Sequence, residues 1–231
     1  MKLLTTILFF IFHFFGFSQD TLSKSNILSE PEVQTIFTDA VKANLGIRFQ
    51  IFRVYEYSDK LSKHYLVLTE RIQGEKAKND SIKAVNVLVE NKKMSVQWTI
   101  NDFKLKENEV SEESSIWFWS KYIELNDIDG DGIIEPIIIY GTEGINGTGD
   151  GRIKILTYYK GKKMAIRHQN GELDSQRNTK VEKEFYDLPN SIQTKVKEIM
   201  KKIYDDNNAI FPYGWEKAML NKKLTFDERH N

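Results

Sequence analysis

Three features of the sequence predict an α+β fold. An amphipathic helical pattern follows the N-terminal apolar segment, the middle of the chain is a series of strand-like runs, and the last third is again helical in pattern. Short polar turns separate most of the runs, which is typical of antiparallel neighbours. We therefore expect an antiparallel sheet of about seven or eight strands, with an N-terminal helix and a C-terminal helix pair.

The N-terminal helix is predicted over residues 30–44. Ser29 is followed three residues later by Glu32, the spacing of a capping box. Apolar residues then recur at helical spacing: Val33, Ile36, Phe37, Ala40 and Val41. Gly46 offers the left-handed conformation that ends many helices.

The strand-like runs extend over residues 47–168 and are rich in β-branched and aromatic residues. Apolar and polar residues alternate on both sides of residues 91–93, which predicts a half-buried hairpin there. A second hairpin is expected at residues 159–162. Residues 116–125 are expected to form one strand, with Trp117, Trp119 and Leu125 on one face and Phe118 on the other. Those aromatic side chains fit either core packing or a surface on which carbohydrate stacks.

The C-terminal part, residues 190–220, is predicted to be helical. Asn190 can cap a helix, and one face of that helix carries an apolar stripe: Ile192, Val196, Ile199, Met200 and Ile203. Lysines occupy the other faces, so the helix either packs on the sheet or lies on a membrane surface. A short final helical stretch is expected at residues 216–220.

Residues 1–18 have the pattern of a secretory signal peptide. Lys2 precedes an apolar run, and Gly16 and Ser18 are small residues at the positions that precede a cleavage site before Gln19. An uncleaved membrane anchor is the alternative, although the run is about 15 residues long and a spanning helix needs about 20. We expect an exported protein, periplasmic or at the cell surface or secreted, with no transmembrane span after cleavage. Residues 19–231 would then form a single α+β domain.

Composition narrows the possible partners. The chain has 33 basic and 33 acidic side chains, and this balance argues against nucleic acid as a partner. It has no cysteine, which excludes disulfides, a cysteine-linked lipid anchor and a cysteine nucleophile.

The most informative motif is an acidic loop at residues 127–135. It carries carboxylates at alternate positions, then a glycine and a further acid: Asp127, Asp129, Asp131, Gly132 and Glu135. With the backbone carbonyl of Ile133, this spacing follows the first nine positions of an oxygen-ligand calcium loop. Ile138 stands where an EF-hand has its bidentate glutamate, and the flanking patterns are strands, so an EF-hand is excluded. We predict a structural Ca²⁺ ion. The alternative is a polar turn in which the aspartates bond backbone amides.

The loop resembles the calcium-binding hairpin of FG-GAP and VCBS-type repeats, with strand-like residues 123–126 before it and 136–140 after it. The motif occurs once, so the resemblance implies the metal loop and not a propeller. The chain as a whole is similar to an exported Gram-negative bacterial family labelled surface polysaccharide biosynthesis proteins. The segments that carry this similarity are residues 45–47, 127–142 and 211–215. It implies carbohydrate or a cell-envelope protein as partner, and it assigns no catalytic residue.

A glycine-rich segment, residues 141–151, follows the acidic loop. It is either a connection between two strands or a ligand-binding loop, in which Glu143, Asn146 and Asp150 would face the ligand. No phosphate-binding P-loop is present, because no Gly-Lys-Ser/Thr sequence follows.

Two functions remain open. The first is a non-catalytic calcium-binding protein that binds glycan or a partner in surface polysaccharide assembly. The second is a polysaccharide-directed hydrolase with its acids around residues 141–151. We assign no catalytic residue, because the sequence has no G-x-S-x-G motif and the histidines outside the signal peptide (His64, His168 and His230) lack the spacing of a triad or metal site. The sequence therefore favours the non-catalytic function.

Overall fold

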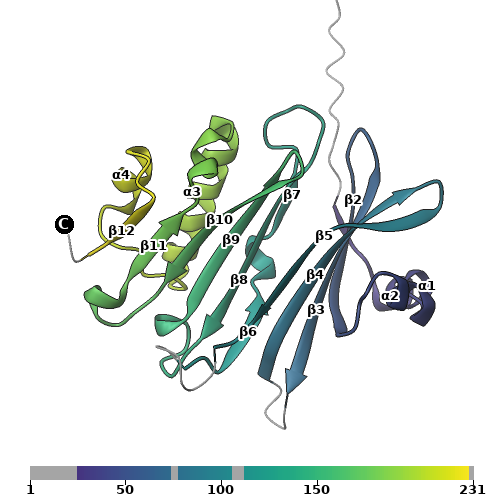
Figure 1. Ribbon diagram of the computed structural model, residues 1–231, viewed down its shortest axis with the longest axis horizontal. Helices are drawn as coiled ribbons and strands as arrows, with labels where there is room; N and C mark the ends of the chain where they lie inside the picture. The colour runs from purple at the N-terminus through teal and green to yellow at the C-terminus, as the bar shows by residue number, and fades with distance from the viewer. Residues whose placement is uncertain (1–24, 74–77, 106–111, 229–231) are drawn as a thin grey trace, which may run out of the picture.

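The computed structural model describes residues 25–73, 78–105 and 112–228. The predicted signal peptide at residues 1–18 lies outside them. The predicted α+β class is confirmed: antiparallel strands form most of the molecule, with two helices near each end of the chain (Figure 1).

The helices and strands have the following bounds. The helices are α1 (Glu30–Ile36), α2 (Asp39–Asn44), α3 (Asn190–Asp205) and α4 (Trp215–Leu220), and the 3₁₀ turns are η1 (Ser120–Tyr122), η2 (Thr148–Asp150), η3 (Asp174–Gln176) and η4 (Lys183–Asp187). The strands are β1 (Asn26–Ile27), β2 (Gln50–Ser58), β3 (Lys63–Gln73), β4 (Lys78–Glu90), β5 (Lys93–Phe103), β6 (Ser115–Phe118), β7 (Glu124–Asn126), β8 (Glu135–Glu143), β9 (Arg152–Tyr159), β10 (Lys162–Gln169), β11 (Asn178–Val181) and β12 (Thr225–Asp227).

The strands divide between two sheets. The first sheet has five strands in the order β1-β2-β3-β4-β5. The second sheet has seven: the path β12-β11-β10-β9-β8-β6, with β7 also paired to β8. The sequence shows strands and turns but not this division, because β5 and β6 follow one another in the chain without pairing.

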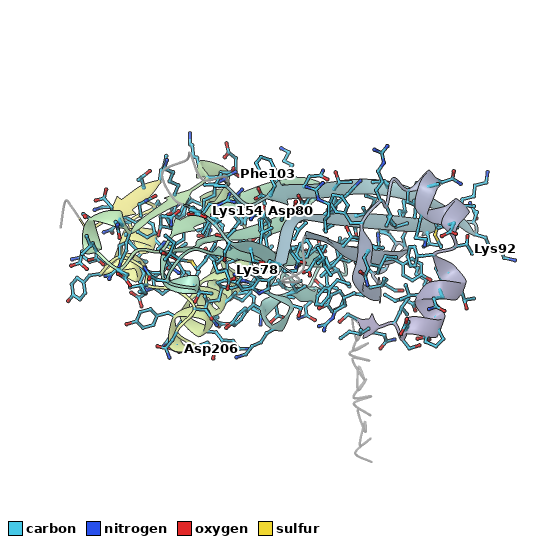
Figure 2. All side chains as sticks on the ribbon, turned by 90° about the horizontal axis from the view of Figure 1, so that it is seen from below. Lys78, Asp80, Lys92, Phe103, Lys154 and Asp206 are labelled. Carbon is cyan, nitrogen blue, oxygen red and sulfur yellow. The ribbon has the colours of Figure 1, made fainter. Side chains whose placement is uncertain are left out.

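Alternation along the central strands places the two sheets face to face between helices. In β3, Tyr65 and Val67 pack with α1 and α2 and the residues beside them, whereas Leu66 and Leu68 pack against the second sheet. In β8, Ile138 faces the first sheet, and its two neighbouring isoleucines face α3 and α4. The molecule is therefore a four-layer α/β/β/α arrangement, elongated across its layers (Figures 1 and 2).

Both predicted hairpins are confirmed. Strands β4 and β5 pair antiparallel around Asn91 and Lys92, which have φ of 49° and 63°. Strands β9 and β10 turn at Lys160 and Gly161, with φ of 47° and 73°. Positive φ at both central residues is the turn geometry that matches the twist of the flanking strands. Lys92, at the tip of the first of these hairpins, projects at one end of the molecule (Figure 2).

The single helix predicted at residues 30–44 is wrong in one respect. The capping box is present, with the Glu32 carboxylate accepting the Ser29 N–H at 2.7 Å. The helix ends at Ile36, however, and a second helix begins after Thr38, whose hydroxyl accepts the Val41 N–H at 3.4 Å. Thr38 is a good N-cap residue, so the chain restarts there and turns the Phe37 side chain into the core.

The strand predicted at residues 116–125 is also wrong. It breaks into β6, the turn η1 and β7. The turn shifts the alternation: Trp119 packs on the α3 side of the second sheet, while Phe118 and Leu125 both face the first sheet. In an unbroken strand Trp119 and Leu125 would lie on the same face, as predicted. The turn places them on opposite faces.

The C-terminal helices are confirmed. The apolar stripe of α3 is buried against the second sheet, as expected for a helix packed on a sheet rather than on a membrane. Asn190 is the first residue of α3 and not its cap, because Pro189 precedes it in extended conformation. Over the described ranges, no helix combines the length and the apolar character needed to cross a membrane.

Candidate metal centre

The acidic loop connects two strands that pair directly with each other. Strands β7 and β8 are antiparallel, and Asn126 lies opposite Glu135. The loop therefore leaves and re-enters the sheet at one point, at the end of the hairpin that β7 and β8 form (Figure 1). Carboxylates eight positions apart in the sequence are thereby brought together.

The four predicted acidic ligands meet at one place. Asp127, Asp129, Asp131 and Glu135 each offer a carboxylate oxygen, and these oxygens all lie within 4.8 Å of one another. The three aspartates are half-buried and Glu135 is 2% exposed. This cluster could hold a metal ion. The carbonyl of Ile133 stays a predicted fifth ligand.

Backbone amides hold the carboxylates in place. Asp127 accepts the Gly130 and Gly132 N–H groups, each at 2.8 Å. Asp131 accepts the Ile133 N–H at 2.8 Å. Both glycines have φ near +80°, which other residues rarely adopt. These are the bonds that a polar turn without an ion would also make, so they do not separate the two interpretations of the loop.

The electrostatics of the cluster bear on the choice between the two interpretations. The pKa of Glu135 is raised to about 7 by burial together with the charges of the three aspartates, against the lowering effect of the Ile128 N–H. A turn needs one or two side-chain acceptors, whereas here four carboxylates repel one another. A bound cation would remove that repulsion.

The loop also joins the two sheets. Lys60, in the turn between β2 and β3, donates its backbone N–H to the carbonyl of Gly132 at 2.9 Å, and its ammonium donates to the carbonyl of Asp131. A Cβ atom at Gly132 would lie 2.8 Å from the Lys60 side chain. Lys60 was not predicted to belong to the site, because it is 71 positions from Asp131 and carries no local motif.

Of the three predicted ligand-facing residues of the glycine-rich segment, Glu143 and Asp150 form side-chain bonds within the protein, and Asn146 is bonded through its backbone N–H. Glu143 forms an ion pair with Lys78 at 2.8 Å and accepts the Ser114 hydroxyl at 2.9 Å. Asp150 accepts the backbone N–H of Asn146 at 3.1 Å. Their role in binding stays a prediction, and the segment has a structural role as the connection between β8 and β9.

A buried ion pair lies at the base of the same segment. Glu113, 2% exposed, accepts from the guanidinium of Arg152 through both carboxylate oxygens, with the Nη2 contact at 2.7 Å. It also accepts the Thr142 hydroxyl at 2.8 Å and the Leu105 N–H at 2.8 Å. Sequence reasoning missed this pair, because the two charges come from distant segments and an isolated Glu or Arg is usually exposed.

His168 and Asn170 form a second buried network. The imidazole contacts the Thr179 hydroxyl at 2.9 Å and the Asn170 amide oxygen at 2.8 Å. Asn170 donates to the carbonyls of Thr148 at 2.7 Å and Asn208 at 3.1 Å. The network ties the glycine-rich segment to the chain that follows α3.

This network makes stability depend on pH. Burial lowers the pKa of His168 from 6.5 to about 4. The unfolded chain therefore binds a proton at a higher pH than the folded one, so the contribution of His168 is fully present above pH 6.5 and is lost as the pH falls toward 4. We expect a loss of about 2 kcal/mol between pH 7 and pH 5, out of about 3 kcal/mol over the whole interval. Urea denaturation at pH 7 and pH 5 measures it. His168→Gln, which cannot titrate, should show a smaller difference between the two pH values, and an equal difference would contradict the assignment.

The predicted metal loop is local, whereas Lys60, Glu113 and Asn170 reach their partners across long stretches of sequence. The resemblance of residues 123–140 to the FG-GAP and VCBS hairpin stays an expectation. Comparison of the chain with protein-family models, with curated proteins and with solved structures found no match.

Proposed function

We propose that this chain is an exported, non-catalytic calcium-binding protein in which the ion holds the loop between β7 and β8. The observation that carries the proposal is the convergence of four carboxylate oxygens within 4.8 Å of one another. Export is proposed from the pattern of residues 1–18.

The donor set favours calcium over other metals. It consists of carboxylates, with a carbonyl predicted in addition, and hard oxygen ligands suit Ca²⁺ and Mg²⁺ rather than Zn²⁺. A loop that offers several carboxylates suits the larger coordination number of Ca²⁺, because Mg²⁺ demands a strict octahedron and retains its waters. The ion would be structural, since the loop is bonded through Gly132 to the first sheet.

The resemblance described above supports a role in surface polysaccharide assembly, by binding glycan or a cell-envelope protein. The alternative, a polysaccharide hydrolase with acids around residues 141–151, is less well supported. A glycosidase needs a general acid with a raised pKa, whereas the hydrogen bond from Lys78 lowers the pKa of Glu143.

Isothermal titration calorimetry with CaCl₂ tests the proposal. We expect one site with a dissociation constant on the order of 10⁻⁴ to 10⁻³ M, the range of extracellular calcium modules. MgCl₂ should give a weaker response. Asp129→Asn should weaken calcium binding at least tenfold, because it removes one negative ligand while keeping an oxygen that can accept the Asp131 N–H.

Asp187→Asn is the matched control, because Asp187 is exposed and lies outside the loop. It should bind calcium as the wild type does. Absence of a saturable calcium heat in the wild type, at millimolar ion, would overturn the proposal.

A further inference from the structure

A cleft of about 710 Å³ opens between the two sheets, beside the metal loop. One wall comes from the ends of β2, β4 and β5 and from the turn between β2 and β3. The other comes from Ile133, Ile134 and the end of β9. In Figure 1 this is the end of the molecule where the loop after β7 stands opposite the β2–β3 turn. The volume falls within the range of small-molecule sites, about 300 to 1,000 Å³.

Two buried polar side chains line this cleft without a hydrogen bond of good geometry among the described residues. His64 is 6% exposed, and its ring nitrogens lie near Asp59 and Gln97 without forming such a bond. Its Nε2 lies 3.3 Å from the Asp59 carboxylate, near enough for an ion pair but not in line for a hydrogen bond. Tyr158 is 5% exposed, and its hydroxyl is likewise unbonded. Leaving a buried polar group unsatisfied costs about 1–3 kcal/mol, so two in one cleft mark a place where water or a ligand can complete them.

The cleft pairs a flat aromatic surface with fixed amides. Trp98 stacks on Tyr158, with ring centroids 3.8 Å apart and planes 12° from parallel. Beside them, the Tyr57 hydroxyl donates to Asn86 at 2.7 Å, and Asn86 donates to Gln97 at 2.8 Å. The amides are thus held in one orientation, and the exposed Gln97 side chain also lies beside His64.

Few charged side chains line the cleft, and one of them is already hydrogen-bonded within the protein. The Asp59 carboxylate already accepts the N–H groups of Leu61 and Ser62, at 2.8 and 2.9 Å. Glu90 and Lys160 are of opposite sign. No cluster of cations lines the cleft to bind a phosphate, and the unbonded groups are a neutral hydroxyl and an imidazole. Burial lowers the pKa of His64, although Asp59 opposes the effect, so the ring favours its neutral form.

We propose that this cleft binds a neutral saccharide of one or two rings. The apolar C–H face of a sugar ring can lie against an aromatic plane, while its hydroxyl groups, which both donate and accept, can bond amides, an imidazole and a phenol. The cleft supplies the plane through Trp98 and the bonding groups through His64, Gln97 and Tyr158. The inference rests on the glycan-binding part of the proposed function, for which it names the site, and does not depend on whether the loop binds an ion.

The test is an NMR titration of the ¹⁵N-labelled protein. The probes are glucose, galactose, mannose, maltose, cellobiose and lactose, each raised until the response saturates, with glycine and lysine as non-saccharide probes. We expect at least one saccharide to shift the indole resonance of Trp98, assigned with Trp98→Phe, together with amide resonances of residues 57–64 and 158–161. Trp98→Ala and Gln97→Ala should each weaken binding at least tenfold.

Trp117→Phe is the matched control, because Trp117 is also partly buried but packs on the α3 side of the second sheet, away from the cleft. It should bind as the wild type does, and the dispersion of each variant's spectrum verifies its fold. The proposal is overturned if no saccharide gives a saturable shift, if the shifts centre on residues 143–150, or if only the amino acids bind. The saccharide titration is run once in calcium and once in EDTA. Saccharide binding in EDTA would support the cleft even if the calorimetry showed no calcium binding, so the two proposals can fail independently.

Discussion

Calcium at about 100 times its dissociation constant should raise the free energy of unfolding of the wild-type protein by about 2.7 kcal/mol. The same ion should reverse the effect of Asp131→Asn. In EDTA this variant should be as stable as the wild type or more stable, because it removes one of four mutually repelling charges and keeps an oxygen to accept the Ile133 N–H. In calcium it should be the less stable protein, because it has lost a ligand.

Urea denaturation of both proteins, in EDTA and in calcium at about 100 times the dissociation constant found by calorimetry, measures this reversal. Asp187→Asn again serves as control, and it should leave the free energy of unfolding unchanged both in EDTA and in calcium. A polar turn without an ion predicts no calcium-dependent difference between Asp131→Asn and the wild type. The metal-site interpretation predicts that Asp131→Asn loses stability relative to the wild type when calcium is added, and the polar-turn interpretation predicts no such change. The hydrogen-bond geometry alone does not distinguish the two interpretations.

Breaking the buried ion pair at Glu113 should have the largest effect of any single charge change discussed. Glu113→Gln leaves the Arg152 guanidinium facing an amide NH₂ in a site from which water is largely excluded. Removing one partner of a buried pair costs about 3–5 kcal/mol. We expect about 3 kcal/mol, because Arg152 keeps a second carboxylate, Asp102, at 3.9 Å.

The control is Lys201→Gln, which breaks an ion pair with Asp205 on the exposed face of α3, where the side chains are 65% and 52% exposed. Exposed pairs contribute less than about 1 kcal/mol. Equal losses for Glu113→Gln and Lys201→Gln, measured by urea denaturation at one ionic strength, would show that the Glu113 pair is solvated and not a fixed part of the core.

The sequence predicts the features whose cause is local. Alternation through Val85 and Val87, two positive-φ residues at the tip of a hairpin, and a stripe through Val196 and Ile203 each follow from neighbouring residues, and each is confirmed. The division into two sheets does not follow from neighbouring residues. A strand with apolar residues on both faces has the same sequence pattern whether a helix or another sheet covers its second face.

The candidate metal centre was predicted almost completely because its acids lie within nine residues. The cleft was not, because its lining comes from segments as far apart as Tyr57 and Tyr158. No residue at the spacing of a known motif marks His64 as part of a site. Tyr57 and Asp59 become its neighbours only through the pairing of β2 with β3. Trp98 likewise reads as one position in an amphipathic strand until Tyr158 is placed against it.

The hydrogen bond between Lys60 and Gly132 connects the acidic loop, residues 127–135, to the cleft between the two sheets. Residues of the β2–β3 turn and of the loop, Leu61 and Ile133 among them, line the same cleft from opposite sides. An ion that fixed the loop would also hold Ile133, and with it one wall of the cleft, in place. Thermodynamic linkage then works in both directions: if calcium tightens the hold on a sugar by some factor, the sugar must tighten the hold on calcium by the same factor. The calcium level of the surroundings would thus set how readily the cleft fills.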